Sequence, residues 1–520
     1  MGIISNLISQ QTDLIRSTKE EIKSVYLSDE RPWVVGYSGG KDSTTSVQLI
    51  FEALSELPND KLHKKVYIIS SDTLVETPLI IQSINTTLKR IQDEALKRDL
   101  PIETHKVKPQ PEQSFWANII GRGYPSPNQK FRWCTDRLKI EPANRFILEK
   151  VSTFGEVIMV LGVRSDESAT RANVIKSHSV DGKTLMRHST LTNAYVYAPI
   201  RSFSVNDVWD YLLSYPSPWG DDNHALNKLY QDSSSGECPL IVDKEIKESA
   251  GSCGNSRFGC WVCTVVQEDK ALNGFIQSGE EWLRPLLEFR NWLADIRDDR
   301  NMRMKYRKNG QVYFKEVRIE EIDGEQCLIA PKKGKRKEMP IPLHKFKIIP
   351  KDQLKDYLTD NNIDLSSTAN PKILIRMEDG KLAQLGLGPF TLEARKEILK
   401  RLLETQRNLK HPHDPNFQLI QIEELKVIRR YWLEAGDWED SLPRIYKEIL
   451  GKDVDWEIND RPLFDYDQIT DLELLCQDLN LDFNLVKKLI SIEKDYAGYK
   501  VRRGIYLEIE KALKQDYLHL

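Results

Sequence analysis

The sequence has 520 residues, of which 40% are hydrophobic and 29% are charged, and its formal net charge is -3. This length exceeds what one hydrophobic core usually serves, so we expect two or three domains. No uncharged apolar run is long enough to span a bilayer, which argues against a membrane-embedded protein. The near-neutral charge restricts any contact with nucleic acid to a local basic patch or to a partner protein.

The first 30 residues are predicted to form an amphipathic helix. Ile8, Leu14, Ile15, Ile22 and Val25 recur at the spacing of one helix face. The segment lacks a basic stretch followed by a continuous apolar core, so we do not expect a signal peptide.

Residues 31–265 alternate short apolar runs with helical periodicity. The candidate strands are residues 33–37, 66–70, 102–107 and 157–161. The segments between them are long enough for crossover helices, which predicts an α/β catalytic domain with a doubly wound parallel sheet. A later helix is predicted over residues 205–213, where Ser204 and Asp207 have the spacing of a capping box.

The pattern of apolar and polar residues changes after residue 265. We expect a connecting helix and a small β subdomain over residues 266–350, and a helical C-terminal region over residues 351–520. A basic loop, KKGKRK at 332–337, interrupts the β subdomain. Such a loop is more often a solvated surface feature than a contact for DNA or for a partner.

The strongest local signal is the loop Ser38-Gly39-Gly40-Lys41-Asp42-Ser43, which follows an apolar strand and precedes a helix. Two adjacent glycines allow consecutive N–H groups to point at one anion, and the helix adds the positive end of its dipole. Lys41 supplies a mobile positive charge, and the two serine hydroxyls can donate hydrogen bonds. This pattern predicts a phosphate-binding loop, and the alternative is a plain Gly-Gly turn.

Polar residues also follow the second and the fourth predicted strands, at the sheet edge where ligands bind in doubly wound folds. After the second strand these are Ser71, Asp72 and Thr73, and after the fourth they are Gly162, Arg164, Glu167 and Arg171. The two arginines can present guanidinium groups to phosphate or pyrophosphate, and Glu167 can orient one of them. The alternative is that they are ordinary surface charges.

Five of the seven cysteines are candidate metal ligands, namely Cys134, Cys238, Cys253, Cys260 and Cys263. The C-x-x-C pair at 260 and 263 lets two thiolates reach one metal, and thiolates favour zinc or iron–sulfur. One thiol is surplus to a four-ligand site, and near Arg257 it could carry a persulfide. Structural zinc and inert buried thiols are the alternatives. An odd cysteine count in a long chain suits a reducing cytoplasm, and we expect Cys327 and Cys476 to lie in the core.

The loop at residues 38–43 resembles the PP-loop of the ATP pyrophosphatase superfamily. The resemblance implies binding of ATP with Mg, cleavage between the α and β phosphates, and catalytic roles for Lys41, Asp42, Arg164 and Arg171. The segments 71–77, 132–139, 162–171 and 199–209 resemble the phosphoadenosine phosphosulfate reductase branch. This second resemblance implies a [4Fe-4S] cluster, with Cys134 at a ligand position of that branch.

The combination of SGGKDSTTS, GVRSDESATRA, GECP and SCGNSRFGCWVCT resembles the DndC family of DNA phosphorothioation proteins. That resemblance implies an ATP-dependent sulfurtransferase that replaces a non-bridging oxygen of the DNA backbone by sulfur. It also implies DNA, a cysteine desulfurase as sulfur donor, and the Dnd proteins DndD and DndE as partners. For the cluster, Cys238 and Cys253 compete for the place beside Cys134, Cys260 and Cys263.

Three alternative functions remain open. A phosphoadenosine phosphosulfate reductase-like enzyme is disfavoured, because no cysteine follows Cys476 and the nucleophilic Cys-Gly-x-His segment of those reductases is missing. A tRNA-thiolating PP-loop enzyme would use similar chemistry on a base. An iron–sulfur DNA-binding or assembly subunit would only sense ATP.

Overall fold

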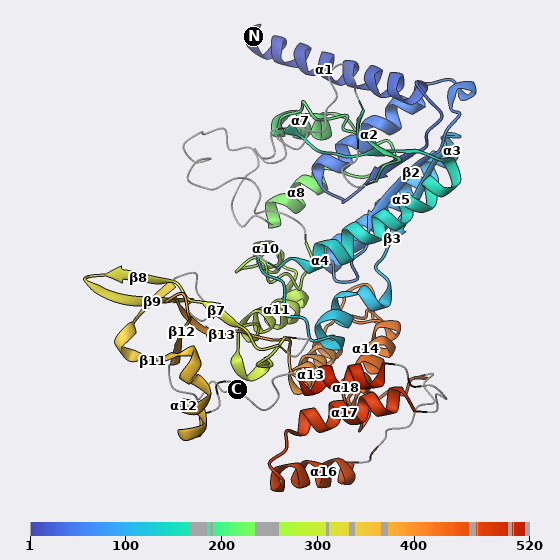
Figure 1. Ribbon diagram of the computed structural model, residues 1–520. Coiled ribbons are helices and arrows are strands. Elements are labelled where there is room, and N and C mark those ends of the chain that lie inside the picture. The colour runs from blue at the N-terminus through green and yellow to red at the C-terminus, as the bar shows by residue number, and fades with distance from the viewer. Residues whose placement is uncertain are drawn as a thin grey trace. The chain divides into compact units, whose positions relative to one another are not determined.

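The computed structural model describes residues 2–129, 131–165, 185–187, 191–233, 259–307, 311–331, 338–363, 365, 373–456, 464, 466–497, 502 and 504–514 (Figure 1). The chain divides into two compact units that interleave along the sequence. Unit 1 comprises Met1–Gln110, Trp133–Trp261 and Asp269–Leu283, and unit 2 comprises Pro111–Arg132, Val262–Glu268 and Arg284–Leu520. The domain boundaries at residues 30, 265 and 350 stay a prediction.

Unit 1 is built on a sheet whose order, among the described residues, is β3-β2-β1-β4-β6-β5. Its strands are β1 (Trp33–Gly36), β2 (Val66–Ser71), β3 (Ile102–Val107), β4 (Val157–Val160), β5 (Met186–Arg187) and β6 (Ala194–Tyr197). Strands β3, β2, β1, β4 and β6 are parallel, and β5 pairs antiparallel with β6 at the edge. The predicted doubly wound parallel sheet is confirmed.

The helices of unit 1 are α1 (Gly2–Leu27), α2 (Lys41–Ser55), α3 (Pro78–Lys97), α4 (Trp133–Thr135), α5 (Glu141–Phe154), α7 (Val205–Ser214), α8 (Asn223–Ser233) and α10 (Lys270–Gln277). The chain steps from β1 to β2 to β3 in one direction and then returns to β4 on the other side of β1. Because such crossovers are right-handed, α2 and α3 lie on one face of the sheet and α5 on the other. Ile147 of α5 packs on Val34, Tyr67 and Ile69 of the strands.

The capping box predicted at the start of α7 is present. The Ser204 hydroxyl accepts a hydrogen bond from the Asp207 N–H at 3.2 Å, and the Asp207 carboxylate accepts one from the Ser204 N–H at 2.7 Å. Two N–H groups that a helix start leaves without helical partners are thereby satisfied.

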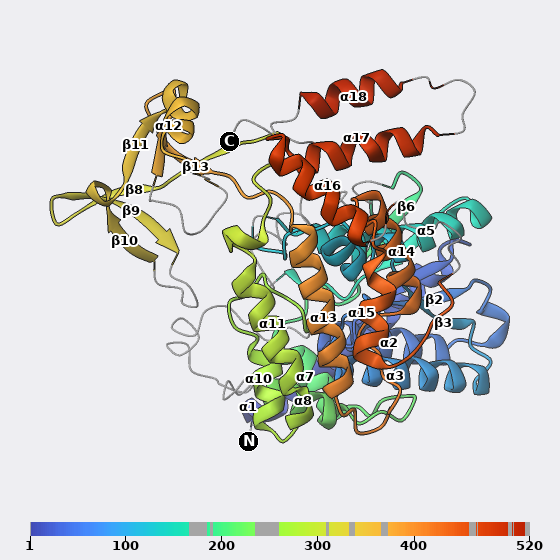
Figure 2. The ribbon, with the colours of Figure 1, turned by 90° about the horizontal axis from the view of Figure 1, so that it is seen from below.

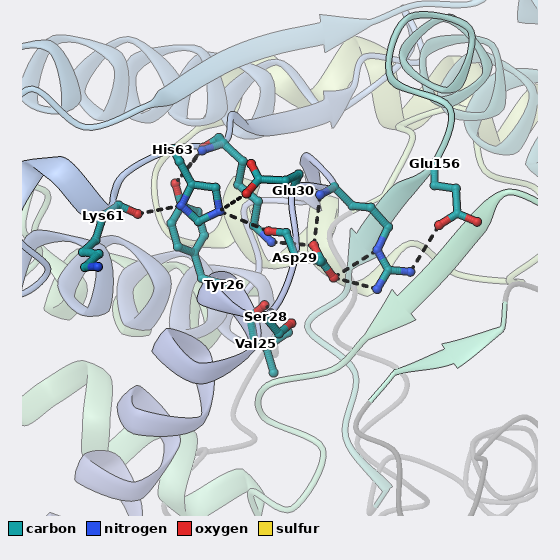
Figure 3. Close-up of polar contacts among 10 residues, drawn as sticks. Val25, Tyr26, Ser28, Asp29, Glu30, Lys61, His63 and Glu156 are labelled. Carbon is teal, nitrogen blue, oxygen red and sulfur yellow. Dashed lines mark hydrogen bonds and ion pairs between the residues drawn. The ribbon is translucent and has the colours of Figure 1, made fainter.

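Helix α1 is attached at the edge of the sheet where the strands begin. The Tyr26 ring meets the Trp33 ring edge-on at 5.6 Å, and the Tyr26 hydroxyl donates to the Lys64 carbonyl at 2.7 Å. Just beyond the helix, Asp29 accepts hydrogen bonds from Arg31 at 2.6 Å and from Lys64 at 2.8 Å (Figure 3). Lys64 is 4% exposed, and burial lowers the pKa of its ammonium group despite the carboxylate.

Among its described residues, unit 2 contains two smaller sheets, ordered β10-β9-β8 and β11-β12-β13-β7. The strands are β7 (Phe314–Glu316), β8 (Ile319–Ile322), β9 (Glu325–Pro331), β10 (Glu338–Pro342), β11 (Lys347–Pro350), β12 (Ile373–Arg376) and β13 (Leu382–Leu385). The β structure thus continues past residue 350, which the sequence pattern did not indicate. The KKGKRK loop lies outside the described residues.

The rest of unit 2 is mainly helical, as predicted for the C-terminal region. Its helices are α11 (Arg284–Ile296), α12 (Leu354–Asp360), α13 (Leu392–Asn408), α14 (Ile422–Glu434), α15 (Ser441–Leu450), α16 (Tyr466–Asp478), α17 (Phe483–Asp495) and α18 (Ile505–Leu513). Figure 2 shows α13 and α15 side by side. Cys327 and Cys476 are buried, at 4% and 2% exposure. Within the described ranges, no helix combines the length and apolar character needed to cross a membrane.

Candidate nucleotide site and cysteine cluster

The predicted phosphate loop turns sharply between β1 and α2. Gly39 has a φ of +72°, and a Cβ atom there would lie 2.8 Å from Ile84 Cγ1. This position therefore requires glycine. Helix α2 begins at Lys41, and Gly40 offers no side-chain cap, so the N–H groups of the first turn face the loop at the positive end of the helix dipole.

The two serines of the loop close it on itself. The Ser43 hydroxyl donates to the Gly40 carbonyl at 2.9 Å and accepts from the Ser38 N–H at 3.2 Å. The Ser38 and Ser43 hydroxyl oxygens are 3.1 Å apart, within hydrogen-bond distance. These bonds fix the backbone of the turn, so the loop has a defined shape before any ligand contacts are considered.

The Asp42 carboxylate pairs with two cationic side chains, one from the loop and one from the segment after β4. Its carboxylate accepts a hydrogen bond from Lys41 Nζ at 3.0 Å and one from Arg164 Nε at 2.6 Å. Arg164 is 2% exposed, and in the described part of the chain its Nη1 has no hydrogen-bond partner. A buried guanidinium N–H without an acceptor is costly, and an anionic oxygen at the loop would satisfy it.

The segment after β4 reaches the loop because Gly162 is small. A Cβ atom at Gly162 would lie 2.7 Å from the Asp42 carbonyl oxygen. This close approach brings Arg164 to the start of α2. The other two predicted residues of this segment, Glu167 and Arg171, lie outside the described residues, and their roles stay a prediction.

Tyr230 of α8 also contacts the loop, although no sequence motif indicated it. Its hydroxyl accepts a hydrogen bond from the Lys41 N–H at 3.1 Å. Lys41 Nζ lies 5.5 Å from the centre of the Tyr230 ring, which is cation–π distance. The ring meets Trp209 of α7 edge-on at 5.2 Å. The contact joins positions 189 residues apart in the sequence, so local patterning carried no signal for it.

The segment after β2 is engaged mainly by its own neighbours and by the cysteines. The Asp72 carboxylate accepts from the Leu74 N–H at 3.0 Å and lies 3.6 Å from Lys108 Nζ. Thr73 is fully buried, and its hydroxyl lies 3.3 Å from Cys260 Sγ. Ser71 is the last residue of β2. The structure thus places Thr73 beside Cys260, at the sheet edge where the strands end.

Cys260 is anchored to the segment after β2 through the backbone. Glu76 and Cys260 form an antiparallel bridge, and the Trp261 N–H donates to the Val75 carbonyl at 3.0 Å. The Thr77 hydroxyl donates to the Gly259 carbonyl at 3.0 Å. These bonds, rather than the C-x-x-C pattern, fix the position of the Cys260 thiol.

Lys139 brings Cys134 and Cys260 into one electrostatic environment. It lies in the π-helical turn Asp136–Ile140 that follows α4, and its Nζ is 3.3 Å from Glu76 Oε1. The Glu76 carboxylate, with the thiol groups of Cys260 and Cys134, raises the pKa of the Lys139 ammonium group. Lys139 therefore pairs directly with Glu76, and the two cysteines contribute to its electrostatic environment.

Cys263 belongs to unit 2, where its carbonyl accepts a hydrogen bond from Arg290 Nε at 2.9 Å. Cys238 and Cys253 lie outside the described residues. Within the described residues, no group of three or more His, Cys, Asp or Glu side chains is placed to hold a metal ion. Thiol donors beside an ammonium group suit an iron–sulfur cluster chemically, but a complete ligand set needs residues beyond Cys134 and Cys260.

Comparison with known proteins gives a family match for one part of the chain. Residues 32–266 match the model of the phosphoadenosine phosphosulfate reductase domain. The uncharacterized protein MJ0066 of Methanocaldococcus jannaschii is 26% identical over 291 residues, which cover 55% of this chain and 47% of that protein. The chain therefore spans about half the length of this relative.

Two solved structures show weaker similarity. Phosphoadenylyl-sulfate reductase from Candida auris, in a phosphate complex, is 14% identical, with 40% of this chain and 84% of that chain covered and a TM-score of 0.26. The U34-tRNA thiolase NcsA from Methanococcus maripaludis, with its [4Fe-4S] cluster, is also 14% identical, with 46% and 80% covered and a TM-score of 0.26. Similarity at this level supports no conclusion about activity. Residues 32–266 are therefore similar in sequence to the phosphoadenosine phosphosulfate reductase domain, and the described residues in this range that belong to unit 1 have the parallel sheet and the diglycine loop that this resemblance predicts.

Proposed function

We propose that the chain is an ATP-pyrophosphatase-type sulfurtransferase that modifies the DNA backbone. The observation that carries the nucleotide part is the pairing of Lys41 and Arg164 on Asp42 at the diglycine loop, with Arg164 Nη1 lacking an acceptor within the described residues. Two cations and the start of a helix at one point suit the β and γ phosphates of ATP, bound together with Mg.

In this proposal, the loop supplies electrostatic stabilisation rather than covalent chemistry. Lys41 and Arg164 offset the negative charge that develops on pyrophosphate as it leaves. Asp42 keeps both cations in place, because each donates a hydrogen bond to its carboxylate. Burial of Arg164, at 2% exposure, keeps water from screening that charge.

The thiols support the sulfur half of the proposal. Cys134 and Cys260 both contribute to the raised pKa of the Lys139 ammonium group, and Cys260 is anchored to the segment after β2, beside the strand that leads into the loop. We propose that these two residues, Cys263, and either Cys238 or Cys253 hold a [4Fe-4S] cluster. When bound, the cluster would supply or bind the sulfur that is transferred.

The transfer itself exchanges one bond for another. ATP adenylates a non-bridging oxygen of a DNA phosphate and releases pyrophosphate. Sulfide, or the outer sulfur of a cysteine persulfide, then forms a bond to phosphorus, and the activated oxygen leaves with AMP. In the persulfide case a second thiolate must attack the inner sulfur, which breaks the S–S bond, frees the phosphorothioate and leaves the two thiols as a disulfide. We propose DNA as the acceptor because of the motifs shared with the DndC family, and a cysteine desulfurase, DndD and DndE as partners.

The experiment that tests this function measures two products. Purified chain with ATP should release pyrophosphate, and Lys41→Ala should abolish the release while leaving the visible absorbance of the cluster unchanged. Mass spectrometry of nuclease-digested DNA should detect phosphorothioate in cells with the chain and none in cells with Lys41→Ala. Sulfur found in a tRNA base instead would identify a tRNA-thiolating enzyme, and ATP binding without pyrophosphate release would indicate a nucleotide-sensing subunit.

A further inference from the structure

The contact between Tyr230 and the phosphate loop has a bearing on ligand affinity. Lys41 is the first residue of α2, and the N–H groups at a helix start are the natural donors to a phosphate. The Lys41 N–H donates to the Tyr230 hydroxyl at 3.1 Å. A single N–H forms one strong, well-aligned hydrogen bond, so this hydroxyl and a phosphate oxygen are alternative acceptors for the same donor.

The position of the hydroxyl strengthens this reasoning. A Cβ atom added to Gly40 would lie 3.1 Å from the Tyr230 hydroxyl oxygen. The hydroxyl oxygen therefore lies directly against the diglycine backbone, beside the space that a side chain at Gly40 would fill. A ligand oxygen bound to that backbone would need the same space.

The same ring also occupies the lysine. Lys41 Nζ lies 5.5 Å from the Tyr230 ring centre while it donates to Asp42 at 3.0 Å. Both the amide and the ammonium group of Lys41 therefore contact Tyr230 or Asp42. Any phosphate that recruits Lys41 must compete with these contacts.

We propose that Tyr230 sets the affinity of the loop for pyrophosphate-containing ligands, because its hydroxyl competes with a phosphate oxygen for the Lys41 N–H. This inference rests on the proposed function of the loop in binding ATP. A neutral hydrogen bond of ordinary net strength favours the closed form over the open form by about 5 to 1. About one sixth of the molecules are then in the open form, so the apparent affinity for the ligand is about sixfold lower than that of the open form.

Tyr230→Phe separates the hydroxyl from the ring. The edge-on contact with Trp209 at 5.2 Å uses only the ring, so the variant should keep the packing of α8 on α7. The matched control is Tyr195→Phe, at a position on β6. It removes a hydroxyl that donates a hydrogen bond to Glu156 at 3.3 Å. Circular dichroism and thermal melting verify that both variants are folded.

Isothermal titration with inorganic pyrophosphate and with ATP gives the decisive measurement. Tyr230→Phe should bind both ligands about sixfold more tightly than the wild-type chain, and Tyr195→Phe should match the wild type. Tyr230→Leu, which also removes the ring beside Lys41 Nζ, should tighten binding by at least the same factor.

The outcomes distinguish this inference from the function on which it rests. If the wild-type chain binds ATP and Tyr230→Phe binds it equally well or more weakly, the competition is refuted and the proposed function stands. Weaker binding would show that the hydroxyl contacts the ligand instead. If neither the wild-type chain nor any variant binds ATP or pyrophosphate, both the inference and the proposed function are wrong.

Discussion

Replacement of Arg164 by Met tests the nucleotide site at its most buried charge. Arg164 is 2% exposed and donates from Nε to Asp42 at 2.6 Å, whereas its Nη1 has no acceptor within the described residues. Methionine is unbranched and fills most of the same space. Asp42 keeps Lys41 as a partner at 3.0 Å, so its carboxylate is not left alone.

The magnitudes differ for ligand binding and for folding. A charge-assisted hydrogen bond from Nη1 to a phosphate oxygen contributes about 1.5–3 kcal/mol. Its loss should weaken ATP binding by about 10- to 100-fold. The free energy of unfolding should fall by only about 1–2 kcal/mol, because the lost bond to Asp42 is partly offset by removal of a buried cation.

Isothermal titration with ATP and thermal melting measure the two quantities on the same preparation. Arg31→Met is the matched control, since Arg31 pairs with Asp29 and Glu156 where the strands begin, away from the loop. It should leave the ATP affinity unchanged. A folded Arg164→Met protein whose ATP affinity lies within twofold of the wild type would refute the assignment of Nη1 to a phosphate.

Two further predictions concern the cysteines and the response to acid. Cys260→Ser should lose the brown colour and most of the iron of the anaerobically purified chain, whereas Cys476→Ala, at a buried position in α16, should retain both; an unchanged iron content would exclude Cys260 as a ligand. Burial raises the pKa of the Asp29 carboxyl, but hydrogen bonds from Arg31 and Lys64 outweigh it and leave that pKa below its usual range. The stabilisation by Asp29 is therefore complete above the ordinary pKa of about 3.9 and is lost as the pH falls through the lower, folded value. Asp29→Asn should melt at a lower temperature than the wild type at pH 7, and the difference should shrink below pH 4; a difference that does not change with pH would contradict this account.

The elements that the sequence predicted are those that local patterns determine. The four predicted strands became β1, β2, β3 and β4 within one residue at each end. Strands β1 and β4 lie inside the sheet and are apolar runs, as a strand buried on both faces requires, whereas the edge strand β3 is apolar and buried only at Ile102 and Val107. The diglycine loop could also be predicted from the sequence, because the turn itself requires a positive φ at Gly39, which glycine adopts readily.

Other elements depend on partners that are distant in the sequence. Strands β6, β12 and β13 were not predicted, and they are defined by their pairing with neighbouring strands, including β4, β11 and β7. Residues 111–132 interrupt the predicted catalytic domain but belong to unit 2. The contacts of Tyr230 with the loop, and of Lys139 with Glu76, join helices to loops through side chains that no spacing rule relates.

The topology of the sheet explains why the diglycine loop and a thiol occur together in unit 1. Parallel strands end at one edge, so the loop after β1 and the segment Thr73–Glu76 after β2 emerge there as neighbours. One backbone bridge from Glu76 then brings Cys260 to that edge. The proposed replacement of an activated oxygen by sulfur needs the nucleotide and the sulfur at one place, and the hydrogen bonding of two adjacent strands, rather than the cysteine spacing, brings the loop and Cys260 to one edge of the sheet.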